Sequence, residues 1–318
     1  VSTAGQSIPT FFLGLLLGAG QAILRDTLDT KIRTEHDIEQ VTERPVIGSI
    51  MWDPSLTPKS AAIAESQSLR AESYRRLRTN LQFLGLEEGH RAIVVTSSVA
   101  SEGKTTTAIN IAATMAAAGD RVLLVDADLR RPRVASALGL EGAAGLTTIL
   151  IGQASAADVV QPQGVGRFDV IASGPIPPNP SELLGFPEMK EFLRQAAKSY
   201  DMVILDAPPV LPVTDAAVLS RIATGAVVVA GSRVANKAQL AEALQTLERV
   251  EARILGIVLN KVHVSDQGGY GYGSGYGYEY GPQSGQPAPV DPMKPRRSAT
   301  SEVSESATMK SPSLPVRV

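Results

Sequence analysis

Short runs of continuous apolar residues, separated by segments of helical pattern, constrain the fold of this chain more than any other feature. Five such runs occupy residues 92–96, 122–125, 203–205, 226–230 and 254–259. Helices are predicted between them at residues 104–118 and 238–250. A strand that is apolar along its whole length is buried on both faces, which is typical of parallel sheets covered by helices on both sides. The sequence therefore predicts an α/β fold with a mostly parallel sheet flanked by helices.

A phosphate-binding loop follows the first apolar run directly. Residues 98–106 read SVASEGKTT, which matches the P-loop pattern G-x-x-x-x-G-K-[ST] with Ser98 in place of the first glycine. Backbone N–H groups of such a loop surround the phosphates, and the glycine allows close approach. Lys104 is expected to bind phosphate, and the Thr105 hydroxyl to bind Mg²⁺. Further nucleotide contacts are expected from Ser98, Ser101, Glu102, Gly103, Thr106 and Asn260.

Three aspartates close the second and third apolar runs, where a nucleotide site needs acidic groups. Asp126 and Asp128 end the second run and Asp206 ends the third. In open α/β sheets, ligands bind outside the carboxyl ends of the strands, which places these carboxylates beside the P-loop. A spacing of two residues in a strand puts Asp126 and Asp128 on the same side. We expect them to face Mg²⁺ and the γ-phosphate of a nucleotide.

Composition and absent motifs exclude several other kinds of protein. The chain has no cysteine, which excludes disulfides, thiolate zinc sites and a cysteine nucleophile. Its three histidines lie far apart, without metal-ligand spacing. The net charge of −2 argues against a nucleic-acid-binding protein, because such proteins usually carry an excess of basic residues. No G-x-G-x-x-G follows a core strand, and residues 260–263 read NKVH where a guanine site needs N-K-x-D. The predicted ligand is therefore ATP with Mg²⁺.

The N-terminal part differs in composition from the centre of the chain. Residues 1–24 are predicted to hold the end of a transmembrane segment, because residues 8–24 are free of charge and apolar on every helical face. Residues 25–59 are charged and interrupted by prolines, which indicates a juxtamembrane linker. The basic residues after the apolar segment favour a cytoplasmic location for everything downstream. The globular domain is predicted at residues 60–264, beginning with a helix over 61–83.

The C-terminal part, residues 265–318, has a third composition. It holds 8 glycines and 7 prolines among 54 residues and is predicted to be disordered. Five of the seven tyrosines of the chain fall within eleven of these residues, flanked mostly by glycine, which keeps their side chains accessible. These five residues, Tyr270, Tyr272, Tyr276, Tyr278 and Tyr280, are too clustered for core packing and indicate a function of their own.

Taken together, these motifs resemble the bacterial tyrosine kinases of surface-polysaccharide synthesis. The resemblance is carried by residues 98–106, by 125–132 (VDADLRRP) and by 203–209 (VILDAPP). In addition, residues 72–83 look like the E-x-x-R-x-x-R helix of that family, and the tyrosine cluster looks like its autophosphorylation tail. The similarity covers about residues 40–280. The apolar segment before it resembles the last membrane helix of a chain-length-determinant, or polysaccharide co-polymerase, module.

The resemblance implies an inner-membrane tyrosine kinase that phosphorylates itself and regulates polysaccharide polymerisation or export. Asp126 would accept the proton of the tyrosine hydroxyl, with Asp128 and Asp206 on the magnesium side. A contact through Glu72, Arg75 and Arg78 would join protomers into a ring in which each tail enters the neighbour's site. A tyrosine phosphatase would be a further partner.

Two other functions stay open on the sequence alone. A partitioning or septum-positioning ATPase would share the fold, but such ATPases carry a second lysine at the position of Val99. A scaffold assembled by ATP binding would need no phosphoryl transfer, and the full set of aspartates argues against it. Glu72, Arg75 and Arg78 could also be an ordinary solvated charge pattern of a helix, worth about 0.2–0.5 kcal/mol per pair. The tyrosine-rich tail could be a low-complexity spacer.

Overall fold

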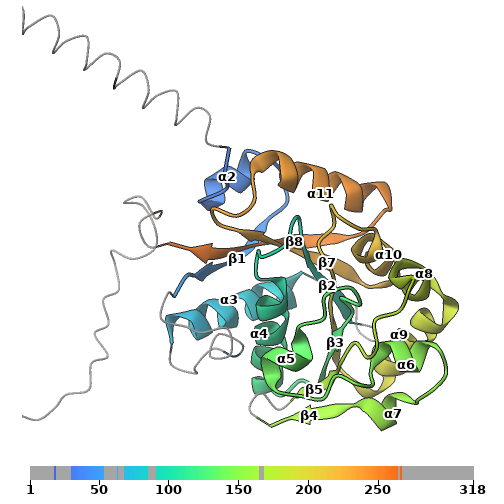
Figure 1. Cartoon of the computed structure of the whole chain (residues 1–318). Helices are drawn as coiled ribbons and strands as arrows, with labels where there is room; N and C mark the ends of the chain where they lie inside the picture. Colours follow the sequence, from blue (N-terminus) through green and yellow to red (C-terminus); the bar gives the residue numbers. More distant parts are fainter. Residues whose placement is uncertain are drawn as a thin grey trace, which may run out of the picture. The chain divides into compact units, whose positions relative to one another are not determined.

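A computed structural model of the chain describes residues 30–53, 68–84, 91–164 and 168–263, together with residues 18, 63 and 266 (Figure 1). Within them, an eight-stranded sheet has the order β1-β8-β7-β2-β6-β3-β5-β4. All neighbouring strands are parallel except β4, which pairs antiparallel with β5. The strands are β1 (Val46–Met51), β2 (Ala92–Ser97), β3 (Val122–Asp126), β4 (Gln161–Gln163), β5 (Phe168–Ile171), β6 (Met202–Asp206), β7 (Gly225–Gly231) and β8 (Ile254–Val262).

Helices cover both faces of this sheet, as the continuous apolar strands predict. Helices α3 (Leu69–Phe83), α4 (Lys104–Ala117) and α5 (Val134–Leu138) contribute to one layer of the core. The other layer lies beneath α2 (Glu35–Glu39), α6 (Leu146–Leu150), α7 (Ala156–Val159), α8 (Pro180–Gly185), α9 (Pro187–Ser199), α10 (Asp215–Ile222) and α11 (Lys237–Arg249). In Figure 1, α3 and α4 lie across the sheet from α11.

Successive residues of a strand serve the two core layers in turn. On β2, Val94 belongs to the core layer that includes α9, α10 and α11, whereas Ile93 and Val95 belong to the layer that includes α3 and α4. All three side chains are fully buried, so no position of this strand tolerates a polar residue without a partner. The central strands thus form a rigid support, and the loops at their carboxyl ends carry the polar residues.

The globular part begins earlier than residue 60, the boundary predicted from the sequence. Part of the predicted linker is the edge strand β1, which pairs with β8 and buries Ile47 and Ile50. The prolines there flank the strand and do not interrupt it: the carbonyl of Pro45 accepts a hydrogen bond from the Ile257 backbone N–H. The helix predicted over 61–83 is described only from Leu69, where Ser68 caps it by accepting a bond from the Ala71 N–H.

The predicted membrane segment at residues 8–24 and the tyrosine cluster lie outside the described residues, apart from residue 18. Among the helices that the structure describes, none combines the length and the apolar character needed to cross a bilayer.

Candidate active site

The P-loop joins the carboxyl end of β2 to the start of α4, as predicted. Its backbone turns through left-handed conformations at Ser101 (φ 69°) and Gly103 (φ 93°), and α4 begins at Lys104. A side chain at position 103 would not fit, because a Cβ atom there would lie 2.1 Å from Nδ2 of Asn260. Glycine is therefore required at this position by both conformation and space.

The Glu102 side chain holds the loop from inside the protein. Its carboxylate oxygens accept hydrogen bonds from the backbone N–H groups of Val99 (2.7 Å) and Gly231 (2.9 Å), and the residue is fully buried. Burial raises the pKa of Glu102 to about 7, although the two backbone hydrogen bonds oppose this change. This side chain thus fixes the loop against β7 and does not face the phosphate side. A nucleotide contact by its backbone N–H stays a prediction.

The end of β8 supports the same loop from outside. Nδ2 of Asn260 donates to the carbonyl of Glu102 (3.0 Å), and Nζ of Lys261 donates to the carbonyl of Ser101 (2.6 Å). The ammonium of Lys261 also lies 5.8 Å from the ring centroid of Trp52. Asn260, predicted to bind nucleotide, therefore acts on the P-loop itself in this structure.

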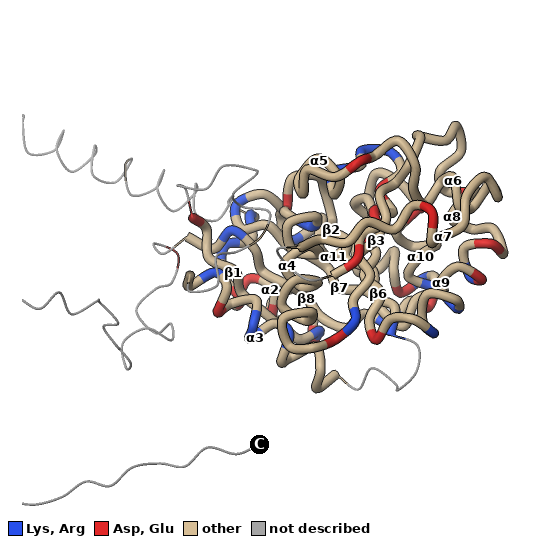
Figure 2. Tube along the Cα trace, turned by 90° about the horizontal axis from the view of Figure 1, so that it is seen from below, with Lys and Arg blue, Asp and Glu red and all other residues tan. Residues whose placement is uncertain are grey.

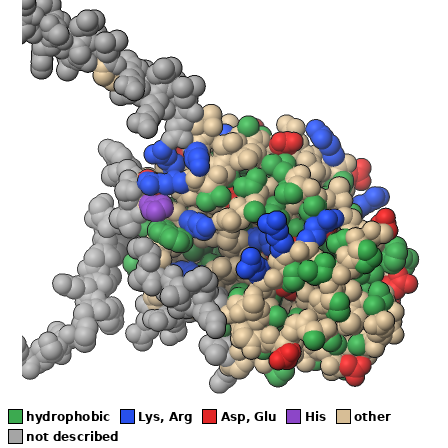
Figure 3. Space-filling view, viewed as in Figure 1, with side chains coloured by type: hydrophobic (Ala, Val, Ile, Leu, Met, Phe, Trp, Pro, Cys, Tyr) green, Lys and Arg blue, Asp and Glu red, His purple; other side chains and the backbone are tan. Residues whose placement is uncertain are grey.

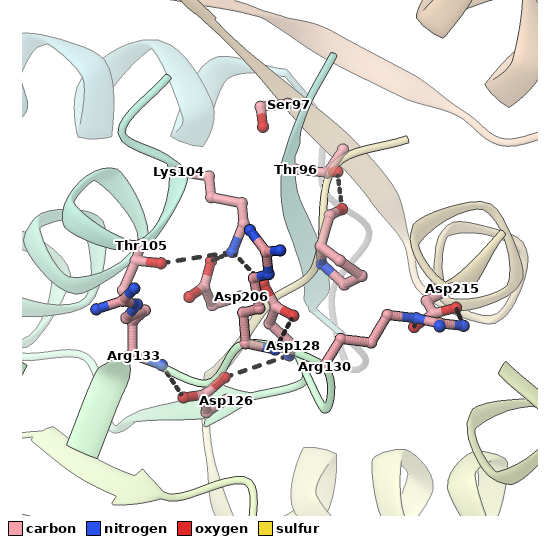
Figure 4. A network of polar contacts seen from close by, with 12 residues as sticks. Thr96, Ser97, Lys104, Thr105, Asp126, Asp128, Arg130, Arg133, Asp206 and Asp215 are labelled. Carbon is pink, nitrogen blue, oxygen red and sulfur yellow. Dashed lines mark hydrogen bonds and ion pairs between the residues drawn. The ribbon is translucent and has the colours of Figure 1, made fainter. Parts of the chain in front are cut away.

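Lys104 lies between two of the predicted carboxylates (Figure 4). Its Nζ is 2.9 Å from Asp128 Oδ2, 3.3 Å from Asp206 Oδ1 and 3.5 Å from the Thr105 hydroxyl. Burial on its own would lower the pKa of Lys104, but the charges of Asp206 and Asp128 outweigh it and raise that pKa. The lysine therefore stays charged and balances part of the negative charge of the site.

Asp126 and Asp206 stand opposite each other on neighbouring strands. They are register partners in the β3–β6 ladder, and both side chains are fully buried. Asp126 Oδ2 accepts hydrogen bonds from the backbone N–H groups of Arg133 (3.0 Å) and Val134 (2.9 Å), and Oδ1 accepts one from Asp128 (3.2 Å). Burial first, and then the charge of Asp206, raises the pKa of Asp126 to about 7. Burial also raises the pKa of Asp206, against the effect of Lys104.

The side chains around Lys104 suit a magnesium ion that is held jointly with a nucleotide. Asp206 Oδ2 is buried and has no hydrogen-bond partner among the described residues, so an electron-rich oxygen is left for a cation. The Thr105 hydroxyl and the Asp128 carboxylate both contact the ammonium group of Lys104, so they lie close to this oxygen. The described residues contain no group of three or more His, Cys, Asp or Glu that could hold a metal by themselves. Mg²⁺ usually takes one or two carboxylates and completes its shell with phosphates and water.

Comparison with known proteins decides the family. A family model described as an AAA domain matches residues 90–257. The tyrosine-protein kinase YwqD of Bacillus subtilis is 43% identical over 211 residues, which cover 66% of this chain and 89% of the relative. The chain belongs to the bacterial tyrosine kinases.

Other members of this kinase family agree. The putative tyrosine-protein kinase CapB of Staphylococcus aureus is 32% identical over 65% of this chain and 90% of its own length. The solved kinase domain of the Escherichia coli tyrosine kinase ETK superposes with a TM-score of 0.66 at 32% identity, over 72% of this chain and 95% of that domain. The chimerical protein CapA2B2 gives a TM-score of 0.67 at 33% identity, over 72% of this chain and all of the other. The α/β fold, ATP with Mg²⁺ and tyrosine-kinase activity follow from this membership.

The kinase chain spans very different shares of its relatives. Its alignment covers most of the Bacillus and Staphylococcus proteins but only 30% of the tyrosine-protein kinase wzc of Salmonella typhimurium, which is 34% identical over 212 residues. The putative tyrosine-protein kinase EpsB of Ralstonia nicotianae is covered to 38%.

One element of the kinase site was missed by the sequence analysis. Arg130, two residues after Asp128, donates to both carboxylate oxygens of Asp215 at 2.9 and 3.0 Å. Asp215 is fully buried at the start of α10 and also accepts from the Ser181 hydroxyl of α8 at 2.5 Å. The loop that carries Asp128 is thereby fixed to two helices (Figure 4). Arg130 belongs to the segment DLRRP at residues 128–132, but nothing in the sequence identifies Asp215 as its partner.

The remaining predicted residues of the kinase are placed in different surroundings. Ser98 is buried at the start of the loop, and its hydroxyl has no hydrogen-bond partner in the described part of the chain. Thr106 lies in the first turn of α4, where its carbonyl accepts a bond from the Asn110 side chain. On α3, Glu72 pairs with Arg75 of its own helix at 3.2 Å, and both are partly exposed. Arg78 instead donates to the carbonyl of Thr114 on α4.

Proposed function

We propose that this bacterial tyrosine kinase transfers the γ-phosphoryl group of ATP to tyrosines of the tail of a second copy of the chain. The proposed acceptors are Tyr270, Tyr272, Tyr276, Tyr278 and Tyr280. The observation that supports the proposal most directly is the position of Lys104 between Asp128 and Asp206, at the end of a P-loop that begins a helix. Basic and acidic side chains both occur on the face shown in Figure 3.

In the proposed reaction, the tyrosine oxygen attacks the γ-phosphorus of ATP while the bond to the oxygen bridging the β- and γ-phosphates breaks. Phosphotyrosine and ADP are the products, and the phenolic proton goes to Asp126. Among the residues that the structure describes, Oδ1 of Asp126 accepts one hydrogen bond, so a lone pair is left for this proton. Lys104 would bind the phosphates, and Thr105, Asp128 and Asp206 would hold Mg²⁺. That ion, when bound, neutralises charge that develops on the phosphate oxygens.

Transfer between copies requires contacts between protomers, for which α3 is the proposed surface. Glu72 and Arg75 are 49% and 39% exposed, so each can exchange its neighbour on the helix for a group of a second copy. Arg78 is held against α4 and would support the helix more than reach across. The proposed assembly is a ring, and the proposed partners are a membrane polysaccharide co-polymerase module and an opposing tyrosine phosphatase. The proposed location is the inner membrane, with the kinase domain in the cytoplasm. The proposed role is control of polysaccharide polymerisation or export.

A mixing experiment tests both the chemistry and its direction. The wild type and Lys104→Ala are incubated with ATP and Mg²⁺, and phosphate is mapped by intact mass and peptide sequencing. We expect several phosphates on the tail of the wild type and none on Lys104→Ala alone. A donor with all five tail tyrosines changed to phenylalanine should then phosphorylate a tagged Lys104→Ala acceptor.

Two results would contradict the proposal in different ways. ATP hydrolysis with a bare tail would refute tyrosine transfer to these residues and return the ATPase and scaffold alternatives. Phosphorylation of the wild type together with an unmodified Lys104→Ala acceptor in the mixture would refute transfer between copies but leave the kinase chemistry intact.

A further inference from the structure

A second cavity lies at the end of the sheet opposite the P-loop. It has a volume of about 1040 Å³ and lies between α9, α10 and α11, which occupy one side of the sheet in Figure 1. Its floor includes Ala92 and Thr224, at the amino ends of β2 and β7, whereas the P-loop leaves the carboxyl end of β2. The cavity is therefore separate from the nucleotide site and is larger than one side chain requires.

The difference in helix length explains why this groove exists. α10 has 8 residues, whereas α9 and α11 on either side of it have 13 each. The shorter helix ends at Ile222 and leaves a hollow beside it. The hollow is walled by apolar side chains, which include Leu193 of α9, Val218 of α10 and Val250 at the end of α11.

The residues that line this groove are basic as well as apolar. Four cationic side chains contribute to it, Lys190, Arg194, Arg221 and Arg253, and the lining includes no Asp or Glu. Arg194 is already paired with Glu191 on the same helix, and Arg253 donates to the carbonyl of Leu84. Figure 2 shows basic and acidic residues close together along and beside α9, in agreement with this local pairing.

Of the four cationic side chains that line the groove, Lys190 and Arg221 are the two without such a partner. Both are exposed, and the side chain of neither has a hydrogen bond or ion pair with any residue that the structure describes. They come from different helices, α9 and α10, and line the same hollow. Two unpaired cations above an apolar wall suit a ligand that joins an anionic group to an apolar body.

We propose that this groove binds the phosphorylated tyrosine segment, residues 268–281, of a second copy of this chain. The inference rests on the proposed function, because the ligand forms only if the tail is phosphorylated. A phosphotyrosine joins an aromatic ring to a group with a charge of about −1.5 to −2 at neutral pH. The ring would pack on the apolar wall, and the phosphate would accept charge-assisted hydrogen bonds from Arg221 and Lys190.

The same chemistry makes binding conditional on phosphorylation. Before phosphorylation the segment carries a single acidic side chain, Glu279, among glycines and tyrosines. It then offers little to attract the two cations, and ordering a glycine-rich segment costs conformational entropy. After phosphorylation several dianions alternate with glycine, so neighbouring phosphates can reach both Lys190 and Arg221. The groove would thus hold the reaction product away from the site that made it.

Fluorescence anisotropy with a synthetic peptide tests this without depending on the kinase activity. The labelled peptide has the sequence of residues 268–281 with phosphate on Tyr276, Tyr278 and Tyr280, and the protein is the full chain in detergent with Lys104→Ala. We expect saturable binding that weakens at least about tenfold for the unphosphorylated peptide. The double variant Lys190→Ala/Arg221→Ala should lose a similar factor.

A matched control removes the same charge from α9 and from the neighbouring helix α11. Lys198→Ala/Arg249→Ala changes two exposed cations on α9 and α11 that do not line the groove, and it should keep the affinity within about twofold. Unchanged binding in the groove variant, or equal loss in both variants, would overturn the proposal. Equal binding of a peptide with phosphoserine at the three positions would refute the assignment to phosphotyrosine. Because the peptide is phosphorylated chemically, failure of the proposed autophosphorylation gives a separate result.

Discussion

Glu102 is expected to make the stability of the folded protein fall as pH rises through neutrality. The carboxyl group has an ordinary pKa near 4.5 when the chain is unfolded, and burial raises the pKa to about 7 in the fold. The folded state therefore binds this proton more tightly than the unfolded state does. The resulting stabilisation is fully present below pH 4.5 and is lost between that value and about pH 7 to 8.

The size of the effect follows from the two pKa values. Their difference corresponds to a loss on the order of 3 kcal/mol in the free energy of unfolding when the pH is raised from 4.5 to above 7. The pKa of about 7 already includes the opposing effect of the two backbone N–H groups, which lie 2.7 and 2.9 Å from the carboxylate oxygens.

The assay is urea unfolding of the nucleotide-free wild type and Glu102→Gln at a series of pH values from 5 to 8.5. Other titrating groups contribute equally to both proteins, so the difference between the two curves isolates Glu102. We expect the wild type to lose stability relative to Glu102→Gln as pH rises through 7. A difference that is independent of pH, or one that changes in the opposite direction, would refute the reasoning from burial.

Three further predictions concern the loops and the surface of the kinase. Gly103→Ala should abolish ATP binding, measured by calorimetry, because its Cβ would lie 2.1 Å from Asn260 Nδ2; Gly119→Ala, with φ 106° and open space around it, is the control and should bind normally. Arg130→Ala should lower the free energy of unfolding by about 2–3 kcal/mol, which is less than the roughly 3–5 kcal/mol typical of a fully buried ion pair because Arg130 is 38% exposed. Adding Asp215→Asn should recover part of that loss, and a double variant whose loss equals the sum of the two single losses would contradict this prediction. Glu72→Ala/Arg75→Ala should slow transfer to a tagged acceptor severalfold and leave the thermal midpoint nearly unchanged, because the pair is exposed; an unaltered rate would remove α3 from the proposed contact.

The parts of the fold that the sequence predicted are those with a continuous apolar run or a clear helical pattern. The five apolar runs became β2, β3, β6, β7 and β8, and the two predicted helices became α4 and α11. The region from residue 134 to 200 received no prediction, because its helices other than α9 have only four to six residues, too few to show a helical period, and its strands β4 (QPQ) and β5 (FDVI) are not continuously apolar. Helix α9 was readable all the same: Met189, Phe192, Leu193 and Ala196 are buried and follow helical spacing.

The structure brings Lys104, Asp128 and Asp206 together as the sequence predicted, but the contacts of the loop around them were not predicted. Motif spacing identified Lys104, Asp128 and Asp206, since the carboxyl ends of parallel strands must meet at one edge. Glu102 was placed among nucleotide-binding residues, whereas its side chain faces Gly231, 129 positions away in sequence. Contacts of that range depend on which strands become neighbours, and a single sequence does not show this order.

The charges around Lys104 imply that ATP and magnesium bind together. In the structure one ammonium group lies against two carboxylates, at 2.9 and 3.3 Å. If Lys104 binds the phosphates of ATP as proposed, those carboxylates would lose their cation while more negative charge arrives beside them. Buried like charges repel strongly, so the nucleotide alone would be opposed by Asp128 and Asp206. A divalent ion would supply the missing positive charge, and the unbonded oxygen of Asp206 would be available to hold it, so each ligand would strengthen the binding of the other.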